Sequence, residues 1–143
     1  PLFLFVSFQA AHSPWNAAPG APRSYDPYLQ MLWALDGAVS TIVGALKKER
    51  MWERTLLLYQ SDNGAVQASK HDVNTPLRGA KGSMFEGGFR TAGFVSGGFL
   101  PAAVRGTKND ITFHIVDWYA TFCHLAGISA ADDARASPSP LRL

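Results

Sequence analysis

The sequence predicts an α/β fold in which a partly parallel sheet is flanked by helices. Three observations predict it: an apolar run rich in Phe at residues 2–8, an amphipathic segment from about Tyr25 to Arg54, and a second apolar run at residues 55–60. Strand, helix and strand in this order form a crossover unit. Such a crossover is almost always right-handed and makes its two strands parallel.

The first strand is expected at residues 2–8, "LFLFVSF". A continuous apolar run of this length is typical of a strand that is covered on both faces in a parallel sheet. The run ends in "QAAHSPWNAAPGAPR", where prolines and a glycine stop regular structure. His12 is therefore expected just beyond the carboxyl end of this strand.

The helix between about Tyr25 and Arg54 is predicted from its apolar spacing. Apolar residues recur at three- and four-residue steps, namely Leu32, Leu35, Val39, Ile42, Val43 and Leu46. Asp26 and Pro27 supply an N-cap and a first-turn proline. A largely basic run at residues 47–50 suits the negative end of the helix.

The later elements are predicted from shorter signals. "TAGFVS" at residues 91–96 is expected to form a third strand, and "IVDWYATFCHLAG" at residues 115–127 a helix that stops at Gly127. The tail at residues 129–143 offers little to bury and is expected to be disordered. At 143 residues with 47% hydrophobic composition, the chain suffices for one modest core.

Composition argues against several classes of protein. The net charge is +2 without a basic stripe, so nucleic acid is not an expected partner. The apolar runs fall short of the ~20 residues that a membrane span needs. "LFLFVSFQAA" follows no basic residue, so we interpret it as a buried strand and identify no targeting segment. Cys123 has no second cysteine with which to form a disulfide or a CxxC metal site.

Residues 61–90, "SDNGAVQASKHDVNTPLRGAKGSMFEGGFR", are long for a simple connection. Asp62 and Asn63 offer the hard oxygen ligands that calcium and magnesium prefer, although alone this dipeptide more often forms a turn. A calcium site takes roughly six to eight oxygens, so other ligands are required. In a parallel sheet, His12 and these two residues would share the edge where ligands bind.

Lys81 lies in "RGAKGS", which lacks the spacing of a P-loop. Its flanking glycines would let an anion approach the backbone beside the ammonium group, whereas an isolated "GAKG" would indicate only a solvated lysine. Arg78 could bind an anion or pair with Glu86. We favour the ion pair because so long a loop needs internal anchors.

In their order and spacing, four stretches resemble the sulfatase family of the alkaline-phosphatase-like superfamily. They are "FQAAHSPW", residues 28–65 ending in "SDNGA", "PLRGAKGSMFEGGFRTAGFV" and "HIVDWYATFCHLAG". Within the family, "RTAGFV" and "HIVDW" look most like the arylsulfatase B subfamily. The resemblance implies that residues 1–128 are the C-terminal part of a sulfatase catalytic domain, followed by a low-complexity tail.

The resemblance also implies roles for individual residues. Asp62 and Asn63 would be ligands of one calcium ion, Lys81 would contact the sulfate, and His12 would hydrogen-bond the sulfate or its ester oxygen. Three further residues match the family signature and are expected to shape the loop around the site: Arg78, Glu86 and Arg90. A cation, an ammonium group and a proton donor would together stabilise the charge that develops on the leaving oxygen.

The implied activity is that of a sulfuric ester hydrolase of the arylsulfatase type. It would act on aryl sulfates or sulfated carbohydrates, including glycosaminoglycans that contain N-acetylgalactosamine, in the lysosome or outside the cell. The family's nucleophile is a formylglycine, made by the formylglycine-generating enzyme in a Cys/Ser-x-Pro-x-Arg motif that this sequence lacks.

We therefore expect the missing first part of the domain to carry the nucleophile and the remaining calcium ligands, and the 143 residues alone to be inactive. Two alternatives remain open. The parent could be a phosphoester or phosphonate hydrolase of the same superfamily, or the chain could be a non-catalytic calcium- or anion-binding module.

Overall fold

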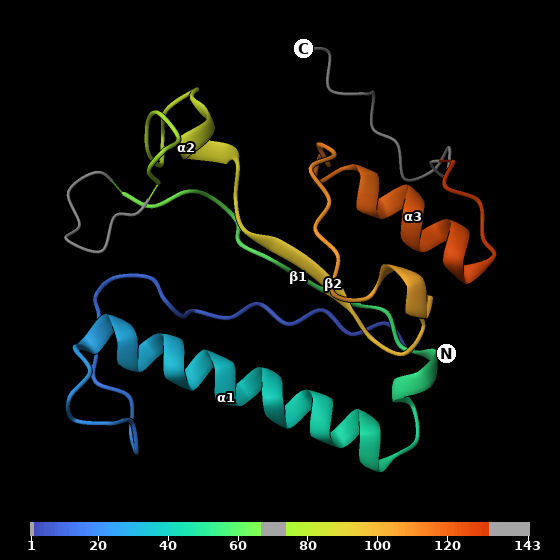
Figure 1. Cartoon of the computed structure of the whole chain (residues 1–143), viewed down its shortest axis with the longest axis horizontal. Coiled ribbons are helices and arrows are strands. Elements are labelled where there is room, and N and C mark those ends of the chain that lie inside the picture. The colour runs from blue at the N-terminus through green and yellow to red at the C-terminus, as the bar shows by residue number, and fades with distance from the viewer. Residues whose placement is uncertain (1, 67–73, 132–143) are drawn as a thin grey trace. The chain divides into compact units, whose positions relative to one another are not determined.

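The computed structural model describes residues 2–66 and 74–131, and these residues divide between Arg105 and Gly106 into two compact units. The first unit contains α1 (Pro27–Lys48), β1 (Leu57–Gln60), α2 (Glu86–Phe89) and β2 (Gly93–Ser96), with short 3-10 turns at Trp52–Arg54 and Ala102–Val104 (Figure 1). The second unit contains α3 (Asp117–Ala126). From residue 132 onward, the predicted disordered tail lies outside the described residues.

Helix α1 begins where the sequence predicted. Asp26 Oδ1 accepts a hydrogen bond from the Leu29 amide at 3.0 Å, and Pro27 fills the first turn, where a missing N–H costs little. The helix ends at Lys48, earlier than the predicted Arg54. The chain turns away because Arg50 adopts φ 54°, in the left-handed region, before the turn at Trp52–Arg54.

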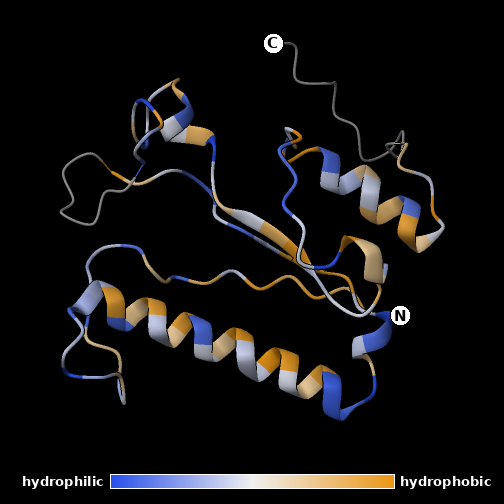
Figure 2. Cartoon of the chain, in the orientation of Figure 1, coloured by the Kyte–Doolittle hydropathy of each residue, from blue (hydrophilic) through white to orange (hydrophobic). Residues whose placement is uncertain are grey.

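The predicted apolar stripe is the less exposed side of α1. Leu35 is buried, and the five other apolar residues of the stripe are half-buried. Figure 2 shows apolar and polar residues alternating along the turns of this helix. Helix α1 therefore directs its apolar face towards its own unit, as the three- and four-residue spacing predicts.

By length and composition alone, α1 is also apolar enough to cross a bilayer, with a hydropathy of 1.4 in its most apolar window. The core helix of a soluble domain meets the same criterion. This property of α1 is therefore weak evidence for a membrane span.

The strands predicted at residues 55–60 and 91–96 are confirmed as β1 and β2. They form an antiparallel pair in which Leu57 lies opposite Ser96 and Gln60 opposite Gly93. Across the pair, the rings of Tyr59 and Phe94 stack with centroids 5.2 Å apart. This cross-strand contact fixes the register on one face of the sheet.

The prediction of a strand at residues 2–8 is wrong. The predicted parallel pairing of this strand with residues 55–60 is therefore wrong as well. The described residues of this segment form no strand, and Phe5 is 80% exposed. An apolar run becomes a strand only when a neighbouring backbone accepts and donates its hydrogen bonds. In the described part of the chain, β1 and β2 pair with each other and no strand is paired with residues 2–8.

The helix predicted at residues 115–127 is confirmed as α3 in the second unit. Asp117 in the first turn of α3 accepts a hydrogen bond from the His114 amide at 2.8 Å. Gly127 ends the helix with φ 70°, and its N–H donates to the His124 carbonyl at 3.1 Å. A residue with a side chain would be strained there, so the glycine accounts for the stop. Cys123 is the buried residue of α3.

We predict that Asp26→Ala lowers the free energy of unfolding by about 1 kcal/mol, because it removes the N-cap of α1. Asp36→Ala is the matched control, since Asp36 lies exposed within the same helix and caps nothing. Alanine favours helix more than aspartate does, so the control should be neutral or slightly stabilising. Urea denaturation of the natural polypeptide that contains these residues measures both, and equal losses would contradict the capping role.

Candidate active site

The loop that follows β1 presents two oxygen-bearing side chains. Asp62 is exposed, and Asn63 Nδ2 donates to the Gly64 carbonyl at 2.8 Å, while Ser61 Oγ donates to the Asn63 carbonyl at 3.2 Å. Among the described residues, none donates a hydrogen bond to the Asp62 carboxylate or to Asn63 Oδ1. Both groups therefore retain the hard oxygen atoms that a divalent cation needs.

Gly64 brings this loop against the start of α2. Its N–H donates to the Gly88 carbonyl at 2.9 Å, and a Cβ atom at this position would collide with the carbonyl oxygen of Gly87. Gly87 is equally confined, because a Cβ atom there would collide with the carbonyl oxygens of Gly79 and Arg78. Its N–H donates to the Arg78 carbonyl at 2.8 Å. The glycines of this segment thus permit a close backbone approach that larger residues would prevent.

The segment around Lys81 is held beside the same loop. The Lys81 N–H donates to the Ala65 carbonyl at 2.9 Å, and the Ala80 N–H donates to Ser83 Oγ at 3.1 Å. Gly79 and Gly82 have φ values of 87° and 85°. These positive angles explain why glycine flanks this part of the chain on both sides.

Lys81 and His12 meet although they are 69 residues apart. Lys81 Nζ lies 3.4 Å from His12 Nε2, and both side chains are exposed. His12 Nδ1 lies 2.7 Å from the Ser13 carbonyl. Because a carbonyl oxygen can only accept, a hydrogen bond at this contact requires the tautomer with the proton on Nδ1, and Nε2 is the nitrogen that faces Lys81.

Two contacts of Lys81, and not the predicted parallel sheet edge, link His12 to the loop that carries Asp62 and Asn63. The bond from Lys81 to Ala65 ties the lysine to the loop that carries Asp62 and Asn63. The contact between Lys81 and His12 then adds the histidine.

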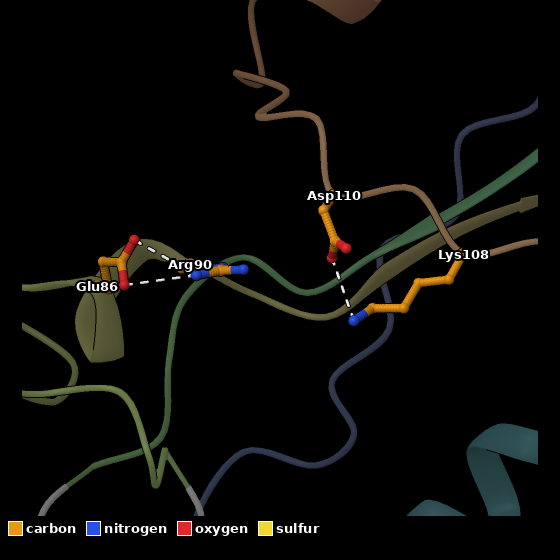
Figure 3. A network of polar contacts seen from close by, with 4 residues as sticks. All are labelled: Glu86, Arg90, Lys108 and Asp110. Carbon is orange, nitrogen blue, oxygen red and sulfur yellow. Dashed lines mark hydrogen bonds and ion pairs between the residues drawn. The ribbon is translucent and has the colours of Figure 1, made fainter.

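The predicted ion pair between Arg78 and Glu86 is wrong. Both carboxylate oxygens of Glu86 instead lie 3.5 Å from Arg90 Nη1. Figure 3 shows these two side chains pointing toward each other. Glu86 and Arg90 are four residues apart across α2, so they meet on one side of it. The Arg78 guanidinium stacks over the Phe85 ring, 3.9 Å from its centroid.

Asn74 is a residue that the sequence reasoning missed. Its side chain accepts from the Ala65 N–H at 3.0 Å and donates to the carbonyls of Ala65, at 3.0 Å, and Gly79, at 3.3 Å. The only sequence signal is its place in "NTP", which indicates a turn. A turn prediction does not reveal that the side chain connects two other loops.

An open cavity of about 320 Å³ also touches this region. It is lined by parts of residues 61–65, 74–77 and 90–92, including Asn63 and Arg90. His12, Asp62 and Lys81 do not line it. Of the four candidate site residues, Asn63 is therefore the one that the cavity reaches.

Comparison with known proteins identifies the family. The sulfatase family model matches residues 1–128. The chain belongs to the sulfatase family. Among its sulfatase relatives, arylsulfatase J of Mus musculus is 39% identical over 134 residues, covering 88% of this chain and 22% of that protein. Arylsulfatase A of Homo sapiens is 33% identical over 132 residues, covering 89% of this chain and 25% of that protein.

The name of a third relative refers to a sulfated sugar. N-acetylgalactosamine-6-sulfatase of Sus scrofa is 30% identical over 139 residues, covering 93% of this chain and 26% of that protein. The chain thus spans about a quarter of the length of these sulfatases. No solved structure matches it significantly.

We predict that Gly64→Ala lowers the free energy of unfolding by about 1–3 kcal/mol, because the new methyl group collides with backbone. Gly44→Ala is the control, since a Cβ at Gly44 in α1 would meet nothing within 4 Å. The control should stabilise by up to about 1 kcal/mol, because alanine favours helix. Urea denaturation compares the two, and a Gly64→Ala variant as stable as wild type would contradict the close approach.

Proposed function

We propose that these residues supply part of the active site of a calcium-dependent sulfatase that cleaves sulfate esters. The observation that carries the proposal is the contact between Lys81 Nζ and His12 Nε2 at 3.4 Å. It supports a site in which an ammonium group and a proton-transfer group reach the same ester. Membership of the sulfatase family supports sulfate as the group that they bind.

Lys81 and His12 would act on different oxygens of the ester. The Lys81 ammonium group would bind a non-bridging sulfate oxygen as a point charge and stabilise negative charge in the transition state. His12 would give a proton to the ester oxygen as the S–O bond breaks. Nε2 is the ring nitrogen that lies beside Lys81, so this proton transfer would use Nε2.

Asp62 and Asn63 fit a calcium site in their chemistry and their availability. A carboxylate and an amide oxygen are hard ligands, and described residues donate no hydrogen bond to either. The described residues contain no cluster of three or more His, Cys, Asp or Glu side chains that could hold a metal. We therefore assign the remaining ligands to other parts of the natural polypeptide. When bound, calcium would neutralise charge on the sulfate.

We propose that the nucleophile is a formylglycine elsewhere in the natural polypeptide. The formylglycine-generating enzyme would produce it. The Cys/Ser-x-Pro-x-Arg motif does not occur in these 143 residues. We propose that residues 1–128 serve as the C-terminal part of the catalytic domain. Arg78, Glu86 and Arg90 would then shape the surrounding loop without contacting the sulfate.

We propose aryl sulfates or sulfated carbohydrates as substrates, including esters of N-acetylgalactosamine. Relatives named as arylsulfatases and as an N-acetylgalactosamine-6-sulfatase support this choice. We also propose that the natural polypeptide is most like the arylsulfatase B subfamily and that it acts in the lysosome or outside the cell.

We predict that Lys81→Ala and His12→Ala each lower kcat/KM for 4-nitrophenyl sulfate by about 100-fold, because each removes a group that acts in the transition state. The assay uses the natural polypeptide, produced together with the formylglycine-generating enzyme. Lys108→Ala is the matched control, since Lys108 pairs with Asp110 at 3.2 Å on an exposed surface (Figure 3). The control should retain wild-type kinetics.

The same enzyme is also assayed with 4-nitrophenyl phosphate. Preference for the sulfate supports the proposal, whereas preference for the phosphate would identify a phosphoester hydrolase. Variants of Lys81 and His12 with unchanged kcat/KM would refute the roles assigned to those residues.

We predict that Asp62→Ala raises the calcium concentration for half-maximal activity at least tenfold, because it removes a charged ligand. Asp110→Ala, on an exposed surface, should leave that concentration unchanged. Activity that survives chelation by EGTA would contradict a calcium site. Calorimetry of the 143 residues alone should show little calcium binding, and micromolar affinity would favour a non-catalytic module.

A further inference from the structure

Asn74 joins two loops that carry different parts of the proposed site. Its amide oxygen accepts from the Ala65 N–H at 3.0 Å, and its Nδ2 donates to the Ala65 carbonyl at 3.0 Å. The same Nδ2 donates to the Gly79 carbonyl at 3.3 Å. One side chain therefore contacts the loop after Asp62 and Asn63 and the loop before Lys81.

The contact with Ala65 resembles the pairing of two β-strand residues. The Asn74 amide uses both its donor and its acceptor against the N–H and C=O of a single residue. The Ala65 carbonyl also accepts from the Lys81 N–H at 2.9 Å. Asn74 and Lys81 thus share one acceptor atom, so the orientation of that peptide affects both loops.

We propose that Asn74 is a positioning residue, which holds the Asp62–Asn63 loop against the Lys81 loop so that cation and lysine reach the same sulfate. The proposal rests on the sulfatase function proposed above. It requires an amide at this position, because the contacts need one acceptor and two N–H donors. Aspartate has almost the same shape but lacks both donors.

The chain offers a matched comparison for this requirement. Asn109 is an exposed asparagine of the second unit, and its Oδ1 accepts from the Ile111 N–H at 2.9 Å. It accordingly makes a local side-chain contact but connects no parts of the proposed site. Asn109→Asp therefore controls for a change of amide to carboxylate on the same polypeptide.

The experiment compares Asn74→Asp and Asn74→Ala with Asn109→Asp and wild type. Activity on 4-nitrophenyl sulfate is measured over a range of calcium concentrations, and thermal unfolding is followed without calcium. Both Asn74 variants should raise the calcium concentration for half-maximal activity by about 10- to 100-fold, as loss of a residue that orients metal ligands commonly does. Asn109→Asp should leave it unchanged.

A purely structural role would give a different result. Loss of folded enzyme would lower kcat and the unfolding temperature while the calcium midpoint and KM stayed at wild-type values. That result, or an Asn74→Asp variant with a wild-type calcium midpoint, would overturn the proposal.

A second readout separates this inference from the proposed function. Calcium binding is measured by calorimetry on the same variants, independently of turnover. If wild type binds calcium but cleaves no sulfate ester, the function fails while a weaker calcium affinity of both Asn74 variants still supports positioning. If wild type cleaves the ester and both variants match it in calcium affinity, only the positioning role fails. A wild type that binds no calcium would overturn both.

Discussion

The hydrogen bond from the Lys81 N–H to the Ala65 carbonyl is the contact on which the geometry of the candidate site depends. It closes the long segment between β1 and β2, so that a lysine and two oxygen-bearing side chains belong to one local structure. Neighbouring backbone bonds from Gly64 to Gly88 and from Gly87 to Arg78 support it. The small residues are required because these backbones approach too closely for a Cβ atom.

Burial contributes less to this region than hydrogen bonding does. Among the described residues, the buried hydrophobic ones are Leu35, Ala80 and Cys123, and many large apolar side chains remain exposed. Ala80 is the member of this group that lies next to Lys81. The position of the lysine is therefore determined mainly by directional backbone contacts, which specify geometry more narrowly than apolar packing does.

The charged residues around the site divide into two groups. Lys81 lies against His12, and the proposed function assigns to this pair the positive charge and the proton that act on a sulfate ester. Glu86 and Arg90 satisfy each other across α2, and Arg78 stacks on Phe85, so these three contribute to the loop's own structure. Among the described basic residues of this segment, Lys81 is the one whose side chain lies against a histidine.

The sequence by itself determined the elements whose signals are local. Asp26 and Pro27 start α1, and Gly127 ends α3, because each acts on backbone groups within a few residues. The family motifs likewise nominated His12, Asp62, Asn63 and Lys81. Only the tertiary structure decided the partners: in the part of the chain that the structure describes, residues 2–8 pair with no strand, and Glu86 lies against Arg90 instead of Arg78. It also revealed Asn74, since contacts between separate loops depend on the path of the whole chain, which local spacing does not encode.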